Sequence, residues 1–183
     1  MPVYAALLQG VNIGTKKRIA MADLRALVEA AGAADVSTYV NSGNVVLSHP
    51  EEDAAALEAR LEQVLAGHVG LRVPVLLRSA DELDRVVADN PFPAAAAEPR
   101  TLHVTFLRRE PGREAVRAVE AMDTGPDRVV VRGRELYAFL PHLMSGATVD
   151  LQRLAGVLGV DGTARNWNTV TRLAQLTRAL VRG

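Results

Sequence analysis

Tyr39-Val40-Asn41-Ser42-Gly43-Asn44 lies between two runs rich in β-branched and apolar residues, at positions 36–40 and 45–47. Gly and Asn accept the positive φ that tight turns require, so the stretch predicts a β-hairpin. Three side chains of the turn, Asn41, Ser42 and Asn44, can form hydrogen bonds, and Tyr39 precedes them. A turn needs only one or two such residues. The stretch is therefore a candidate binding element as well as a candidate turn.

The segments on both sides of this turn have the periodicity of a small α/β unit. Expected strands lie at residues 3–8, 36–40, 45–48 and 73–78, and expected helices lie at residues 20–31 and after Pro50. Residues 3–8 are continuously apolar, as in a central strand that is covered on both faces. The order β-α-β-β-α-β is that of the split βαβ, or ferredoxin-like, unit.

This topology places two polar loops side by side. The first two strands of the unit run parallel with the third between them, so their C-terminal ends lie at one edge of the sheet, about 10 Å apart. We expect the loop at residues 9–18 to face the turn at residues 41–44. The loop carries Asn12 and the chain's only two lysines, Lys16 and Lys17, although a solvated loop is the simpler interpretation of the lysines.

The second half of the chain resembles the first, with one element fewer. After a Pro- and Ala-rich linker we expect a strand at residues 101–107, a helix, a hairpin at residues 129–139 and a helix at residues 148–158. No fourth strand is predicted, because residues 160–169 lead into a final helix that ends near residue 180. The predicted fold is α+β, with two ferredoxin-like halves in tandem at residues 1–89 and 90–183, the second imperfect and ending in a C-terminal helix.

The final helix offers a second candidate site. Its predicted start, Arg165-Asn166-Trp167-Asn168-Thr169, combines N-cap residues with a cation. A helix N-terminus also exposes unpaired N–H groups to an anion. The alternative is a purely structural N-cap with Trp167 packed in the core.

Composition excludes several classes of chemistry and partner. The chain has 183 residues, a formal net charge of zero and no Cys, so disulfides and Cys-ligated zinc are excluded and a strongly basic nucleic-acid binder is not indicated. The four histidines are scattered without metal-ligand spacing. Ser42 precedes Gly43 but has no predicted His near it, which argues against a nucleophile. The sequence indicates no cofactor, no membrane span and a cytoplasmic protein; catalytic residues stay unassigned.

Three motifs together resemble a known family. They are Leu7-Leu8-Gln9-Gly10-Val11-Asn12-Ile13-Gly14, the stretch from Thr38 to Val45, and Thr163-Ala164-Arg165-Asn166-Trp167-Asn168-Thr169-Val170. With these motifs the chain resembles a bacterial family of unknown function, domain-of-unknown-function family 1697. The resemblance implies tandem ferredoxin-like units and no assigned reaction. The family's first motif commonly has Arg where this chain has Gln9 and Gly where it has Thr15.

Two hypotheses from different classes follow. In the first, polar loop residues bind a small anionic ligand, a phosphate-bearing metabolite or a nucleotide, with an aromatic wall from Tyr39 or Trp167. The candidate residues are Asn12, Lys16, Lys17, Tyr39, Asn41, Ser42, Asn44, Arg165, Asn166, Trp167 and Asn168. In the second, the protein is an RNA-binding module that uses Tyr4 and Tyr39 on an open sheet face, or a protein-interaction module. A homodimer is also left open.

Overall fold

The computed structural model describes residues 1–183 and shows an α+β protein with two four-stranded antiparallel sheets. The chain divides into two compact units. The first comprises Met1–Asp84 and Leu173–Gly183, and the second comprises Arg85–Arg172. Each unit contains one of the two sheets. No helix is both long and apolar enough to cross a membrane.

The first sheet is built in the predicted order. Its elements are β1 (Val3–Leu8), α1 (Met21–Ala30), β2 (Ala34–Tyr39), β3 (Asn44–Ser48), α2 (Ala54–Val69) and β4 (Val75–Ser79). The strands are arranged β2-β3-β1-β4, and every neighbouring pair is antiparallel. β3 therefore lies between β1 and β2, which confirms the predicted arrangement. All six residues of β1 are buried, as the apolar run predicts.

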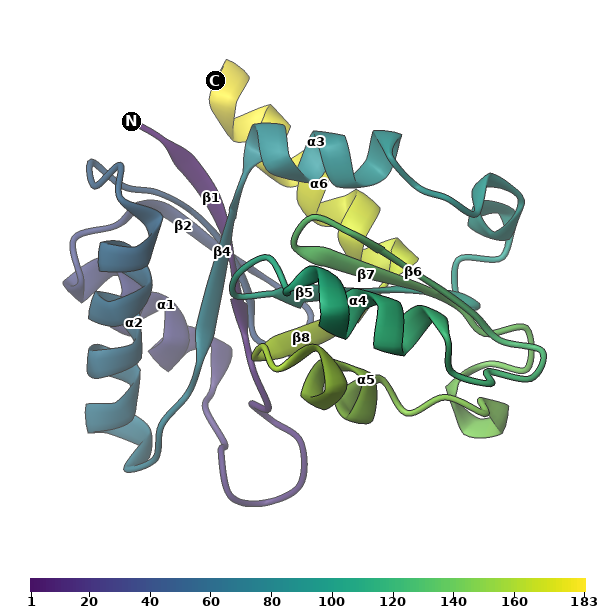
Figure 1. Cartoon of the computed structure of the whole chain (residues 1–183). Coiled ribbons are helices and arrows are strands. Elements are labelled where there is room, and N and C mark those ends of the chain that lie inside the picture. Colours follow the sequence, from purple (N-terminus) through teal and green to yellow (C-terminus); the bar gives the residue numbers. More distant parts are fainter. The chain divides into compact units, whose positions relative to one another are not determined.

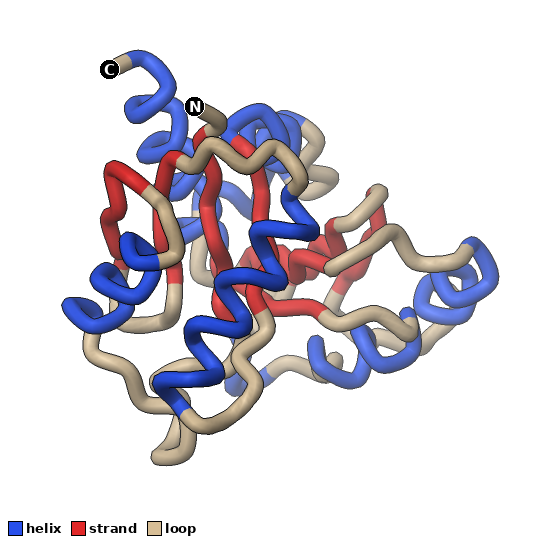
Figure 2. Tube along the Cα trace, turned by 90° about the vertical axis from the view of Figure 1, so that its left-hand side faces the viewer, coloured by secondary structure: helices blue, strands red, loops and turns tan.

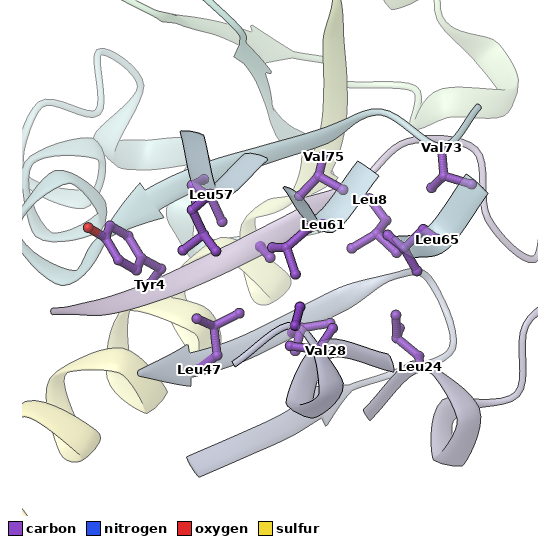
Figure 3. Packing of buried hydrophobic residues seen from close by; sticks show 14 of the residues in the cluster. Tyr4, Leu8, Leu24, Val28, Leu47, Leu57, Leu61, Leu65, Val73 and Val75 are labelled. Carbon is purple, nitrogen blue, oxygen red and sulfur yellow. The ribbon is translucent and has the colours of Figure 1, made fainter. Parts of the chain in front are cut away.

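One face of this sheet packs against α1 and α2. Leu24 and Val28 of α1 and Leu57, Leu61 and Leu65 of α2 point toward alternate residues of the strands, including Leu8, Leu47 and Val75 (Figure 3). Figure 2 shows the two helices on the same face of the strands. The helical spacing of these leucines and valines gives each helix one apolar stripe, and burial of a Leu or Val side chain stabilises the fold by about 1.5–3 kcal/mol.

The second sheet repeats the first, including a fourth strand that the sequence did not predict. Its elements are β5 (Leu102–Leu107), α4 (Arg113–Glu120), β6 (Arg128–Arg132), β7 (Glu135–Phe139), α5 (Leu151–Leu158) and β8 (Gly162–Asn166) (Figure 1). The strands are arranged β6-β7-β5-β8, and β8 pairs antiparallel with β5. The expectation that residues 160–169 form no strand is therefore wrong. β8 contains Gly, Ala, Arg and Asn, and its pairing with β5 overrides this low strand propensity.

The two sheets correspond residue by residue at their last strand. Ala5 of β1 pairs with Arg78 of β4, and Val104 of β5 pairs with Arg165 of β8. Both arginines are buried, and in each the Nη1 donates to the carbonyl of the preceding residue at 2.9 Å. β4 is an edge strand, but Arg78 is only 1% exposed, so it differs from an ordinary edge-strand arginine.

A helix follows the last strand of each sheet directly. α3 (Ala80–Ala88) begins after Ser79, whose Oγ accepts from Glu82 N at 3.2 Å, while the Glu82 carboxylate accepts from Ser79 N at 2.8 Å. The two bonds form a reciprocal capping box. The linker contains a short 3₁₀ helix, η1 (Pro93–Ala97), and a second one, η2 (Met144–Gly146), precedes α5. α6 (Trp167–Arg182) follows β8.

Candidate functional site

Asn12 joins the loop at residues 9–18 to the hairpin turn. Its Nδ2 donates to the carbonyl oxygens of Asn41 and Ile19, each at 3.0 Å, and its Oδ1 accepts from Ile19 N at 3.0 Å. The backbone of Asn12 adopts φ 56°, which Asn tolerates better than most residues. The expectation that these two loops lie side by side is therefore confirmed within the first unit, and the three bonds of Asn12 hold the loop in shape. In Figure 1 the loop is the long purple segment between β1 and α1.

Gly43 allows the turn to approach the end of β1. Its φ is 72°, and its carbonyl accepts from Leu8 N at 2.8 Å. A Cβ at this position would lie 2.8 Å from Leu8 Cβ and would overlap Val11 Cγ2. Only Gly fits both the backbone conformation and the close packing. This part of the motif is thus explained by structure alone.

The remaining turn residues divide into an internal and an exposed group. Asn44 is fully buried, and its Nδ2 donates to Tyr39 O at 3.1 Å and to Ser42 Oγ at 2.9 Å. Tyr39 is half-buried, whereas Asn41 and Ser42 are exposed. Asn44 therefore holds the turn in shape, and Asn41 and Ser42 are the turn side chains that a ligand could reach.

The loop at residues 9–18, called the lysine loop below, supplies unpaired positive charge beside these groups. Lys16 and Arg18 are exposed and Lys17 is half-buried, and none of the three side chains forms an ion pair or a hydrogen bond. The Lys17 Nζ lies 4.0 Å from where a Cβ on Gly10 would stand, so its side chain folds back along its own loop. The Lys17 carbonyl also accepts from Asn12 N at 2.8 Å, which fixes the backbone of the cationic segment.

Arg165 belongs to the second unit and is bound within its own strand. Its Nη1 donates to Thr163 Oγ1 at 2.7 Å and to Ala164 O at 2.9 Å. Burial lowers the pKa of its guanidinium to about 10, because the charged form is poorly solvated. Even so, the group stays positively charged at neutral pH.

The residues after Arg165 have mainly structural contacts. The Oδ1 of Asn166 accepts from Thr169 N at 2.9 Å, which is an N-cap bond for α6. Trp167 is 5% exposed, and Asn168 is exposed. Asn166 therefore acts as the cap that the alternative interpretation predicted. The single pocket shared by residues 12–44 and 165–168 stays a prediction, since these groups belong to different units.

Tyr4 is not available for stacking on a nucleic-acid base. It is 5% exposed, lies in the core beneath α1 and α2, and its Oη donates to Glu51 O at 3.2 Å. Burial and the nearby carboxylates of Glu52 and Glu51 raise its pKa. RNA binding through an open sheet face therefore has no support from this residue.

Two glutamates of α2 have a role that their helical positions did not indicate. Glu58 Oε1 accepts from Leu77 N at 2.8 Å, and Glu62 Oε1 accepts from Val75 N at 3.0 Å. Both N–H groups belong to the edge strand β4, so the carboxylates close an edge that would otherwise expose backbone donors. The sequence signal is their i, i+4 spacing on the buried side of α2. Elsewhere, no cluster of three or more His, Asp or Glu side chains could hold a metal ion.

Comparisons with known proteins give a family and a fold. The family model described as "Protein of unknown function (DUF1697)" matches residues 1–137. A similar solved structure is that of the conserved bacterial protein SP0830 from Streptococcus pneumoniae, with 22% sequence identity and a TM-score of 0.73 over 97% of this chain and 99% of that chain. No curated protein matches the chain significantly. Since the family model matches most of its length, the chain belongs to the DUF1697 family of proteins of unknown function.

Proposed function

We propose that the first unit binds a small anionic ligand, a phosphate-bearing metabolite or a nucleotide, between the lysine loop and the hairpin turn. One observation carries the proposal. The bond from Asn12 to Asn41 O fixes a run of unpaired cations beside two exposed hydrogen-bonding side chains. Cations and amide or hydroxyl donors on ordered backbone are the groups that recognise phosphate oxygens.

The contacts divide the residues of the proposed site into three roles. Lys16 and Lys17 supply charge, and Asn41 and Ser42 supply donors. Asn12 and Asn44 hold the two segments in place, because their amides are already bonded to the backbone of the loop and the turn. No general base stands among these residues, which favours binding over catalysis.

The architecture supports a finer description of the fold as well. In each half the strand order and the position of the two helices in the chain are those of a ferredoxin-like unit. We propose that residues 1–89 and 90–183 each contain one complete unit of this kind and the helix that follows it, α3 or α6. The matching register of Arg78 and Arg165 supports an internal repeat.

A thermal-shift titration tests the ligand proposal. Inorganic pyrophosphate, glucose 6-phosphate and AMP are added separately, and a ligand at 100 times its dissociation constant stabilises the protein by about 2.7 kcal/mol. The Lys16→Ala/Lys17→Ala double variant is expected to lose the shift. Asn41→Ala is expected to weaken it while the Asn12 bond to the backbone carbonyl is kept.

Arg153→Ala provides the matched control, because Arg153 is an exposed cation on α5. It is expected to leave the shift unchanged. If the lysine variant and the control respond alike, or if none of the three probes produces a shift, the binding site is not at this loop.

A further inference from the structure

The outer edge of β6 presents backbone groups that no other segment uses. β6 pairs with β7 across the two-residue loop Gly133-Arg134, with Arg132 opposite Glu135 and Val130 opposite Tyr137. In β7, Leu136 and Ala138 direct their backbone groups toward β5, since Leu140 N donates to Thr101 O in the same ladder. Tyr137 therefore bonds to Val130. By the same alternation, Val129 and Val131 direct their N–H and C=O groups outward.

The corresponding edges of the first sheet are protected. The outward N–H groups of β4 are bonded to Glu58 and Glu62. β2 has an irregular register between Ala34 and Ser37, and Asp35 adopts φ 53°. β6 has neither form of protection. Its register is regular over all five pairs, and its outward backbone groups form no hydrogen bond. Natural proteins rarely leave such an edge open without a use for it.

A groove lies beside this edge, between β6 and α4. This open groove has a volume of about 310 Å³, and its apolar lining includes Val116 of α4 and Val131 of β6. Arg113 and Arg117 line it from α4, and Glu110 and Glu120 balance their charge. Side chains of a strand added to β6 would enter this groove at alternate positions.

The charges on β6 select the kind of strand that can be added. Arg128 and Arg132 are exposed and bracket the three valines. If a second copy of the chain paired antiparallel with β6 about Val130, Arg128 would stand opposite Arg132 of that copy at both ends. Like charges directly opposite are destabilising, whereas acidic residues at the same places are favourable.

We propose that β6 binds an extended acidic peptide segment of another protein as an added antiparallel strand. Two acidic residues, four positions apart, stand opposite Arg128 and Arg132. The two apolar side chains opposite Val129 and Val131 occupy the groove beside α4. Backbone hydrogen bonds to Val129 and Val131 supply the attraction that does not depend on sequence. This surface lies in the second unit and does not depend on the proposed anion site.

Fluorescence anisotropy with a labelled peptide, Ser-Glu-Val-Thr-Val-Glu-Ser, tests the proposal on the full chain. The peptide is expected to bind, and the same peptide with both valine amides N-methylated is expected to bind at least tenfold more weakly, because methylation removes the donors. Val131→Pro removes one outward N–H without breaking a bond to β7, so it is expected to weaken binding by a similar factor.

Charge is tested by Arg128→Glu/Arg132→Glu, expected to weaken binding at least tenfold, against Arg100→Glu, an exposed arginine elsewhere in the same unit, expected to change it less than twofold. Circular dichroism verifies that each variant is folded. Equal binding of the methylated peptide, or no binding at millimolar peptide, overturns the proposal. So does a dimer, detected by sedimentation, that Val131→Pro dissociates, because the edge is then occupied by a second copy.

Discussion

The two hairpin tips occupy equivalent places in the two sheets and do different work. Gly43, in the turn between β2 and β3, packs against Leu8 and Val11 and is bonded to β1. Gly133, in the turn between β6 and β7, has φ 56° and would have open space around a Cβ. The first turn packs against the end of β1 and is bonded to the loop at residues 9–18, whereas the second turn has no such packing around its glycine. The polar residues Asn12 and Asn44 near the first turn are therefore partly explained by the hydrogen bonds that hold the loop and the turn together.

Gly43→Ala, compared with Gly133→Ala, tests this difference in packing most directly. The added methyl group meets Leu8 and Val11 in a backbone conformation that already disfavours Ala. Overpacking and strain together are expected to lower the free energy of unfolding by about 2–4 kcal/mol. Urea denaturation monitored by circular dichroism gives the value. Gly133→Ala is the matched control, with an expected cost of about 1 kcal/mol from φ alone. An equal loss in the free energy of unfolding for the two variants would contradict the close packing of Gly43 against Leu8 and Val11.

The two halves also differ in whether helix carboxylates bond the outward N–H groups of an edge strand. α2 supplies Glu58 to the N–H of Leu77, whereas its counterpart α5 contains no carboxylate in Leu151–Leu158. Glu58→Leu leaves a buried donor without its partner and is expected to cost about 2 kcal/mol. Glu58→Gln keeps an acceptor oxygen and is expected to cost less than half as much. Chemical denaturation of both variants decides, and a Leu variant as stable as the Gln variant would refute the role of the carboxylate.

Most of the first half could be predicted from its sequence because local and tertiary preferences agree there. The apolar run of β1 and Gly43 of the turn favour the structure they form, although the other positive φ of the turn, 50°, falls on Val40 and not on Asn41 or Asn44. The sequence does not predict β8 because helix-cap signals begin at Arg165, and only pairing with β5 makes Gly162–Asn166 a strand. The capping signal itself was real, since Asn166 caps the helix that follows β8. The error was one of boundary and of long-range pairing.

The position of the candidate site could be predicted from the sequence, but the role of each of its side chains could not. Topology alone placed the loop at residues 9–18 beside the turn, as the bond from Asn12 to Asn41 O now shows. Sequence could not separate Asn44, which is buried and bonded within the turn, from Asn41, which is exposed. Both are amides in one motif, and their orientation depends on the twist of the hairpin. The burial of Glu58 and Arg78 likewise depends on packing that is not local.

The central strands offer a smaller contrast. Thr105 of β5 corresponds in register to Ala6 of β1, and its buried Oγ1 has no hydrogen-bond partner. Thr105→Val keeps the shape and removes the unsatisfied hydroxyl, so it is expected to raise the free energy of unfolding by about 1 kcal/mol. Ala6→Ser, which adds a hydroxyl at the equivalent place, is expected to lower it. Thermal and urea unfolding measure both; a destabilised Thr105→Val would show that the hydroxyl has a partner.

The smallest expected effect concerns Tyr4 and His103, two positions earlier in the same strands, which also correspond in register. Tyr4 donates to Glu51 O, whereas the Nδ1 of His103 is buried without a partner, and burial lowers the pKa of His103. The unfolded chain, with an ordinary His pKa of about 6.5, then binds a proton before the folded protein does, so His103 reduces stability as the pH falls below that value. His103→Gln is expected to show a shallower loss of stability between about pH 7.5 and pH 5.5. The other three histidines are present in both proteins, so the difference between the two urea-denaturation series isolates His103. Parallel series would mean that the ring is solvated in the folded protein and that the two positions do not differ in this respect.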